Sequence, residues 1–150
     1  MTAADPFRFY REQHLHDGPV YFAPDEAVAS WLELAEKVRE ELVRMGFAAS
    51  VVTGDPSGLP HGARIWVNKI EPFGVTLDWD PPVRNSPEYL ERVHNRDIGG
   101  VFAYATHASE IITRAMSNVL HEALFEVLID HSRGGSYLYR VLKAPPFRWT

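Results

Sequence analysis

The chain is predicted to fold as one α+β domain over residues 1–150, with an N-terminal helix and one long C-terminal helix packed on an antiparallel four-stranded sheet. Residues 25–45 have helical periodicity, and residues 47–80 contain three segments typical of strands. Residues 98–131 repeat the helical period over a length that no ordinary strand reaches. The 150 residues, 45% of them hydrophobic, are enough to form a hydrophobic core without disulfides or a structural metal.

Residues 1–24 form an aromatic N-terminal arm. Disordered arms are usually poor in aromatic residues, so we expect this arm to pack on the domain. The first helix follows over residues 25–45, where Pro24 marks the start and Gly46 the end. Its apolar positions recur every three or four residues, as in a helix with one buried face.

The sheet is expected to begin as a three-stranded meander over residues 47–53, 63–70 and 73–80. The first two segments are rich in β-branched residues, and a loop dense in glycine and proline separates them. The third alternates strictly, which predicts an antiparallel sheet covered mainly on one face. The residues of this strand expected to face the core are Phe73, Val75, Leu77 and Trp79. Those expected on the opposite face are Thr76, Asp78 and Asp80.

Ser86 is expected to cap a short helix that ends near His94. The long helix then follows over residues 98–131, although residues 98–105 alone fit a short strand equally well. Residues 136–143 are predicted to add the fourth strand, and residues 144–150 form a C-terminal tail. The apolar residues expected to form the buried side of the long helix are Ile98, Val101, Phe102, Ala105, Ile112, Ala115, Met116, Val119, Ala123 and Val127.

Composition limits the function classes. A net charge of −5 argues against a general nucleic-acid binder, which would present a basic surface. No apolar run approaches the ~20 residues that span a bilayer, and the first residues do not have the pattern of a signal peptide. With no cysteine, the chain offers no disulfide or thiolate ligand. We therefore expect a cytoplasmic protein with no membrane or nucleic-acid partner.

The aromatic residues of the sheet point to a binding surface. Trp66 is expected on the face opposite the core, where Tyr137 and Tyr139 of the last strand could join it in one aromatic patch. Asp78 and Asp80 share that outward face. Aromatic anchors of this kind dominate protein interfaces. The alternative is that the N-terminal arm covers this face, or that the two aspartates only protect a strand end.

The long helix carries a second candidate site on its polar side, formed by His107, Glu110, Arg114, Asn118 and His121. Histidine, a positioned carboxylate and an arginine form a usual general acid–base set. The same spacing also describes an ordinary solvated face, with Glu110 and Arg114 as an i,i+4 ion pair. Burial of these side chains in a cleft would favour an enzyme, and full exposure would favour a binding protein.

Metal, cofactor and anion sites are supported less well by the sequence. The segment His14-Leu15-His16-Asp17 could offer two histidines to zinc, but no further ligand is indicated, so no metal is predicted. No dinucleotide or phosphate-binding motif is present, and no cofactor is expected. Residues 132–150 carry four bases and no acid, which suits docking on the acidic body or recognition of an anion. These bases are Arg133, Arg140, Lys143 and Arg148.

The function that the sequence favours is a non-catalytic module of the inhibitor, immunity or accessory type, which binds another protein through an acidic, aromatic surface. The alternative is a small acid–base enzyme or small-molecule-binding protein with a pocket beside the polar side of the long helix. The sequence leaves a homodimer open in either case.

Overall fold

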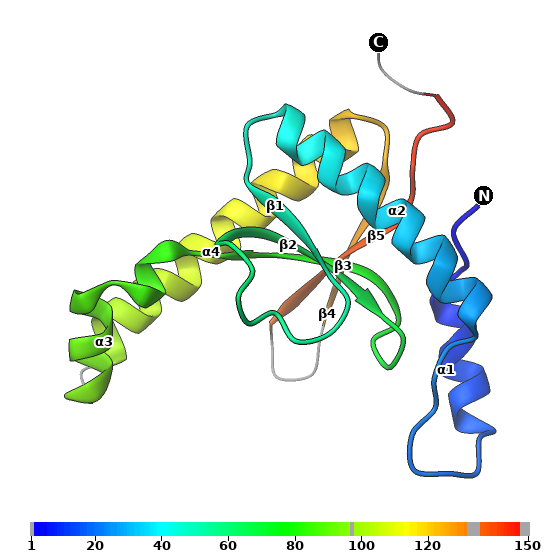
Figure 1. Cartoon of the computed structure of the whole chain (residues 1–150), viewed down its shortest axis with the longest axis horizontal. Helices are drawn as coiled ribbons and strands as arrows, with labels where there is room; N and C mark the ends of the chain where they lie inside the picture. The colour runs from blue at the N-terminus through cyan, green and yellow to red at the C-terminus, as the bar shows by residue number, and fades with distance from the viewer. Residues whose placement is uncertain (1, 97, 132–135, 148–150) are drawn as a thin grey trace.

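The computed structural model describes residues 2–96, 98–131 and 136–147 and has the predicted α+β class (Figure 1). Its sheet differs from the prediction, since it has five strands in the order β1-β2-β3-β5-β4 and is mixed rather than antiparallel. The elements in chain order are α1 (Phe7–His14), α2 (Asp25–Arg44), β1 (Ala49–Val52), β2 (Gly62–Asn68), β3 (Gly74–Asp80), the 3-10 turn η1 (Pro82–Asn85), α3 (Pro87–His94), α4 (Ile98–Glu122), β4 (Glu126–His131) and β5 (Tyr137–Lys143).

The first pair of strands is parallel, which corrects the predicted meander. Ala49 pairs with Ala63 and Val51 with Ile65, running in the same direction. The loop of residues 53–61 makes this possible, because an extended chain covers about 3.3 Å per residue and can return along a four-residue strand. The following hairpin of β2 and β3 is antiparallel, as predicted.

The predicted long helix ends early, and an additional strand follows it. Helix α4 stops at Glu122, where Leu124 adopts a left-handed backbone conformation with φ of 69°. The amide of Phe125 then donates to the carbonyl of Leu120 at 3.0 Å, which closes the helix end as a glycine cap usually does. The chain continues into β4, which pairs antiparallel with β5. Residues 126–131 are therefore a strand and not helix.

One hydrophobic core lies between the sheet and helices α2 and α4. Helix α2 contacts β1, β2 and β3, while α4 contacts β3, β4 and β5. Trp79 has the predicted facing, although it is half-buried at the edge of the core beside the ring of Phe47. The largest fully buried apolar side chains are Trp31, Phe9, Phe73, Leu42, Ile65, Met116, Leu120, Val38, Val52 and Val75.

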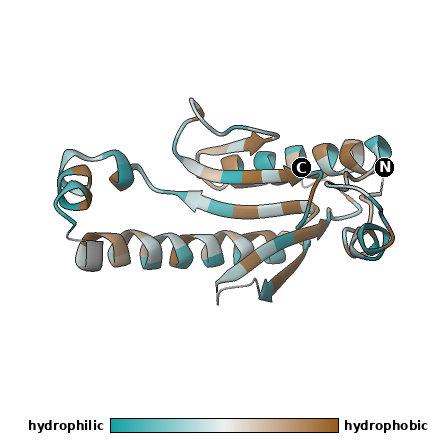
Figure 2. Cartoon of the chain, turned by 90° about the horizontal axis from the view of Figure 1, so that it is seen from below, coloured by the Kyte–Doolittle hydropathy of each residue, from teal (hydrophilic) through white to brown (hydrophobic). Residues whose placement is uncertain are grey.

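The side of α4 that meets the core is rotated from the prediction. Phe102 and Ala115 are exposed, whereas Ser109, Thr113 and Ser117 are buried. The hydroxyls of Ser109 and Thr113 donate to carbonyls one turn earlier in the helix, at 2.6 and 2.7 Å. These bonds satisfy the buried hydroxyls, so small polar residues can replace apolar ones on the inner side. Figure 2 shows α4 along the lower part of the molecule, with β3 above it and the β4–β5 hairpin beside it.

The guanidinium of Arg140 on β5 joins four segments of the fold. The residue is only 2% exposed, and its two terminal nitrogens donate to the carbonyls of Phe73 and Pro72, at 2.8 and 2.9 Å. One of them also donates to the hydroxyl of Tyr10 on α1 at 2.9 Å. The carboxylate of Asp130 on β4 lies 3.6 Å from Nε, which gives the buried charge a counter-ion. The arm, the β2–β3 turn and the last hairpin are therefore held at one point.

Replacing Arg140 by methionine should lower the free energy of unfolding by about 3 kcal/mol, because the carbonyl of Phe73 loses its donor and that of Pro72 keeps only the hydroxyl of Tyr10. Chemical denaturation measures this change. The matched control is Lys143→Met on the same strand, where the lysine is exposed and its ion pair with Glu126 spans 3.8 Å, so little change is expected. Equal midpoints for both variants would mean that the Arg140 contacts do not hold the arm.

Candidate binding face of the sheet

The sheet has a second face that neither α2 nor α4 covers. The residues of β2 and β3 alternate between the two faces, so the register places Trp66 opposite the side that bears Ile65 and Val67. One row of directly paired residues runs across this face. It consists of Val52 on β1, Trp66 on β2, Thr76 on β3, Arg140 on β5 and Leu128 on β4. Val52, Thr76 and Arg140 are buried, whereas Trp66 and Leu128 are partly accessible. We call this side of the sheet the open face.

The N-terminal arm closes one end of the open face. The ring of Phe7 lies over the guanidinium of Arg140, with 5.0 Å from the ring centroid to Cζ, and Tyr10 bonds the same group. Phe9 of the same helix turns the other way and packs edge-on against Trp31 in the core. The arm therefore covers the open face, as the alternative prediction had it, only at the end near the β2–β3 turn. The end that carries Trp66 and Asp78 is left accessible.

Three predicted site residues, Trp66, Asp78 and Asp80, come together at this accessible end. The indole Nε1 of Trp66 donates to Oδ1 of Asp78 at 2.7 Å. Asp80 is paired with Arg64, whose guanidinium nitrogen lies 2.9 Å from Oδ2. The predicted outward facing of the two aspartates is thus observed, and both have partners within the chain.

Sequence reasoning missed two further members of this cluster, His61 and Asn85. Nδ1 of His61 lies 2.7 Å from Oδ2 of Asp80, and its Nε2 lies 3.1 Å from the amide nitrogen of Asn85. A neutral ring with its proton on Nδ1 satisfies both contacts. His61 ends the loop rich in glycine and proline, and Asn85 ends the short turn η1, so no periodic pattern marked either residue. We call the set His61, Arg64, Trp66, Asp78, Asp80 and Asn85 the Trp66 cluster.

Within the Trp66 cluster, the ionised form of the Asp78 carboxyl is in an unfavourable environment. Desolvation raises its pKa above the ordinary value, and the hydrogen bond from Trp66 and the charge of Arg64 offset this only in part. The folded protein therefore disfavours the ionised form of this side chain. Ionisable side chains with a shifted pKa are frequent at functional sites.

Tyr137 and Tyr139 do not join Trp66, which corrects the predicted single aromatic patch. Tyr139 pairs with Leu77 and shares its face, so both tyrosines lie on the core side of the sheet, next to α4. The hydroxyl of Tyr139 donates to Glu110, and the guanidinium of Arg114 lies over the ring of Tyr137 at 5.4 Å. These tyrosines attach the last strand to α4 rather than forming a surface with Trp66.

The polar side of α4 does not form one reaction centre. His107 and His121 are both exposed, and at 1.5 Å per residue they lie about 21 Å apart along the helix. Glu110 accepts from Tyr139, and Arg114 lies 3.8 Å from Glu110 and over two tyrosine rings. Two histidines at this separation cannot act on the same atom. The arrangement is that of a solvated helix face with one anchoring carboxylate.

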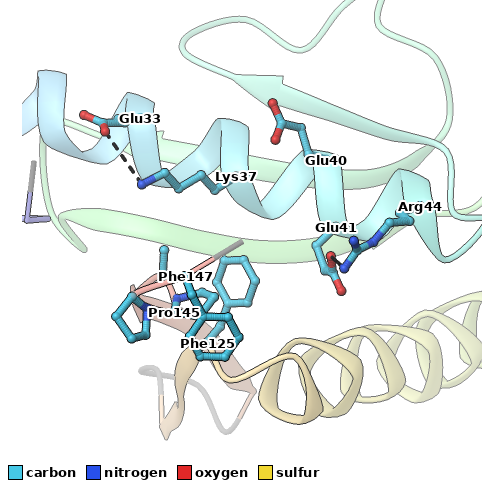
Figure 3. A pocket seen from close by; sticks show the side chains of 10 residues that line it. Glu33, Lys37, Glu40, Glu41, Arg44, Phe125, Pro145 and Phe147 are labelled. Atoms are coloured by element: carbon cyan, nitrogen blue, oxygen red, sulfur yellow. Dashed lines mark hydrogen bonds and ion pairs between the residues drawn. The ribbon is translucent and has the colours of Figure 1, made fainter. Parts of the chain in front are cut away.

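A cleft with a volume of about 510 Å³ lies elsewhere, between α2 and residues 144–147 (Figure 3). Glu33, Lys37, Glu41 and Arg44 line one wall, and Phe125 with residues 144–147 lines the other. The charges of α2 are paired along the helix, since Lys37 lies 3.7 Å from Glu33 and Arg44 lies 2.6 Å from Glu41. These paired charges do not converge on a ligand position.

The remaining sequence candidates have structural roles where they are described. Across residues 2–96, 98–131 and 136–147, no three side chains of the metal-binding types converge. The segment considered for zinc is not extended, because His14 ends α1 and the ring of His16 packs against Tyr21. Of the four bases near the C-terminus, Arg140 pairs with Asp130 and Lys143 with Glu126. Arg133 and Arg148 lie outside the described residues.

No family model, no curated protein and no solved structure matches this chain. In the described part of the chain, no helix has the combination of length and apolar character that a membrane span requires. The function must therefore be inferred from the geometry of the open face.

The contact between Tyr139 and Glu110 should make the fold sensitive to alkaline pH. Burial, followed by the hydrogen bond and charge of Glu110, raises the pKa of Tyr139 from 10.0 to about 12. Folding thus favours the neutral phenol, and this stabilisation is complete below pH 10 and lost as the pH rises from 10 to 12. Two pKa units correspond to about 2–3 kcal/mol.

Denaturation curves at pH 9 and pH 12 measure this effect. We expect Tyr139→Phe to lose less stability over this interval than the wild type, by about 2–3 kcal/mol. Tyr137→Phe is the control, because Tyr137 is 44% exposed and should behave as the wild type does. The same pH dependence in all three proteins would show that Tyr139 ionises as easily in the fold as in the unfolded chain.

Proposed function

We propose that this chain is a non-catalytic binding protein that docks another protein on the open face of its sheet, with Trp66 as the central anchor. The observation that carries this proposal is the fixed indole of Trp66 at the accessible end of that face. The Nε1–H is held by Asp78, so the ring needs little further ordering when a partner binds. Tryptophan is also among the residues that contribute most to protein interfaces.

The charges of the Trp66 cluster indicate what a partner would present. Asp80 is already paired with Arg64 and contacts His61, whereas Asp78 receives the indole hydrogen bond and has a raised pKa. An arginine or lysine of the partner beside Asp78 would stabilise the ionised carboxylate and could pack its stem on the Trp66 ring. The cluster thus suits a basic side chain set in an apolar surrounding.

An inhibitor, immunity or accessory role fits this picture, because such proteins act by occupying a partner's surface. The competing proposal, an acid–base enzyme at the polar side of α4, receives no support from geometry, since its two histidines are exposed and far apart. A cytoplasmic location forms part of the proposal and is supported by the complete lack of cysteine.

Trp66→Ala should weaken binding of the partner by at least about 30-fold, the effect expected when a central anchor worth about 2 kcal/mol is removed. The partner is first recovered by chemical cross-linking in cells, and its dissociation constant is then measured with purified proteins. Phe102→Ala is the matched control, since Phe102 is a 49% exposed aromatic residue on α4, away from the open face.

Circular dichroism of Trp66→Ala shows whether the variant is folded before its affinity is interpreted. If every recovered partner binds the folded Trp66→Ala protein as tightly as the wild type, the open face is not the binding surface. If the protein turns over a small molecule and the rate depends on His107 or His121, the chain is an enzyme and the proposal is wrong.

Asp78→Asn should weaken binding of the partner without lowering the stability of the fold. Asparagine keeps the acceptor for Trp66 but carries no charge, so the desolvation that disfavours the ionised Asp78 disappears. At pH 7 we expect the variant to be at least as stable as the wild type and to bind the partner more weakly. Thermal unfolding and a binding titration measure the two effects. A clear loss of stability would assign Asp78 a role in the fold instead.

A further inference from the structure

Helix α4 is apolar on its outer side as well as on its inner side. Two large apolar residues on this outer side are exposed, Ile111 to 68% and Tyr104 to 62%. A helix with apolar residues on opposite sides is normally covered on both. The sheet covers the inner side through Met116 and Leu120. Helices α2 and α3 also contact α4, and Met45, which follows α2, lines a groove with Asn118, but Tyr104 and Ile111 on the outer side remain exposed.

The outer residues follow the spacing of a helix–helix contact. Starting at Val101, they recur at alternating intervals of three and four residues, which keeps them in one line along the helix. They are Val101, Tyr104, Ala108, Ile111, Ala115 and Asn118. We call this line the outer seam. It contains no charged residue, and at 1.5 Å per residue it is about 26 Å long.

We propose that the outer seam binds a second copy of this chain, with the two α4 helices antiparallel about a two-fold axis. A two-fold interface brings the same surface of both chains together, so the seam must be complementary to itself. The residue sizes meet this requirement. With the axis between residues 109 and 110, Ile111 of each chain faces Ala108 of the other, and Tyr104 faces Ala115.

The pairing of large with small side chains allows close packing. Alanine at two positions leaves room for Ile111 and the Tyr104 ring at the usual interaxial distance of about 8–10 Å. Val101 then faces Asn118 at both ends of the seam. A parallel arrangement would instead place Tyr104 against Tyr104 and Ala108 against Ala108, which is crowded at one level and empty at the next.

The charges beside the outer seam fit a second copy better than a lipid surface. A lipid-binding helix usually has lysine and arginine along its polar side, whereas the polar side of α4 between residues 101 and 118 carries one base, Arg114, and one acid, Glu110. Both are engaged within the chain, with each other and with the tyrosines of β5. The seam itself is neutral, so two chains of net charge −5 can meet there without direct repulsion.

The dimer is compatible with the proposed function and does not depend on it. Helix α4 lies on the core side of the sheet (Figure 2), and its helical spacing places the outer seam on a different side of the helix from Met116 and Leu120, which face the core. The Trp66 cluster is on the opposite side of the sheet. A dimer through α4 therefore leaves both open faces accessible.

Sedimentation analysis of the full chain tests the oligomeric state. We expect the apparent mass to rise with concentration from 17.0 kDa towards twice that value, because a single helix pair of this length buries less than a standard interface. Ile111→Glu should remain at the mass of one chain throughout. Leu15→Glu is the matched control, because Leu15 is an 85% exposed apolar residue far from α4, and it should dimerise as the wild type does.

Cysteine pairs test the antiparallel register, since the chain has no cysteine of its own. Mixed Tyr104→Cys and Ala115→Cys chains should form a disulfide between the two variants under mild oxidation. Each variant alone should cross-link several-fold less, because the two copies of residue 104 lie far apart in this register. Preferred cross-linking of each variant with itself would mean a parallel pair and would overturn the proposed geometry.

A wild-type mass of one chain at the highest soluble concentration also overturns the proposal, as does a dimer that Ile111→Glu leaves intact. Binding of the monomer to lipid vesicles, or to an unrelated protein through Ile111, would identify a different occupant and has the same consequence. Trp66→Ala should dimerise as the wild type does. Loss of the dimer and loss of partner binding can therefore be told apart.

Discussion

The arrangement of the whole chain depends on one buried charge, the guanidinium of Arg140. A buried cation is stable only if its hydrogen bonds are satisfied and a counter-ion is near. Here the two terminal nitrogens donate to two carbonyls of the β2–β3 turn and to the hydroxyl of Tyr10. Among the described residues Nε has no hydrogen-bond partner, but Asp130 lies 3.6 Å from it and supplies the opposite charge. These partners come from distant parts of the sequence. Satisfying one side chain thus fixes the arm, the central hairpin and the last hairpin relative to each other.

This constraint also determines which end of the open face is accessible. Phe7 and Tyr10 must cover Arg140, so the arm occupies the end of the face near the turn. The other end is left to Trp66 and its neighbours. Their charges are largely neutralised within the chain, since Arg64 lies against Asp80, and His61 completes the contact. The proposed binding surface is therefore less acidic than the composition suggests.

Sequence patterns predicted the elements whose periodicity is unambiguous. Helix α2 and the β2–β3 hairpin fall in this group, as does the outward facing of Trp66, Asp78 and Asp80. The direction of β1 was not predictable, because a four-residue strand has the same residue pattern in either orientation. Strand β4 was missed because Leu124, not glycine, ends α4, and Val127 continues the apolar period of the helix.

The sites were harder to predict than the elements, for physical reasons that particular residues show. The tyrosines of β5 were assigned to the wrong face because facing depends on register, and a shift of one residue exchanges the two faces. His61 and Asn85 contribute through loop geometry, which has no period. The buried hydroxyls of Ser109 and Thr113 hid the true inner side of α4, since each is satisfied within the helix itself.

The pairing of Tyr10 with Arg140 has a consequence for how the chain acquires its structure during synthesis. The two residues are 130 positions apart, so the contact cannot form until almost all of the domain has left the ribosome. Until then the carbonyls of Pro72 and Phe73 lack their donor, and α1 has no charge to cover. Contacts of such long sequence separation slow folding and leave apolar surfaces exposed in the nascent chain. The aromatic arm, which precedes the rest of the domain in the chain, is therefore among the last parts of the domain to be fixed.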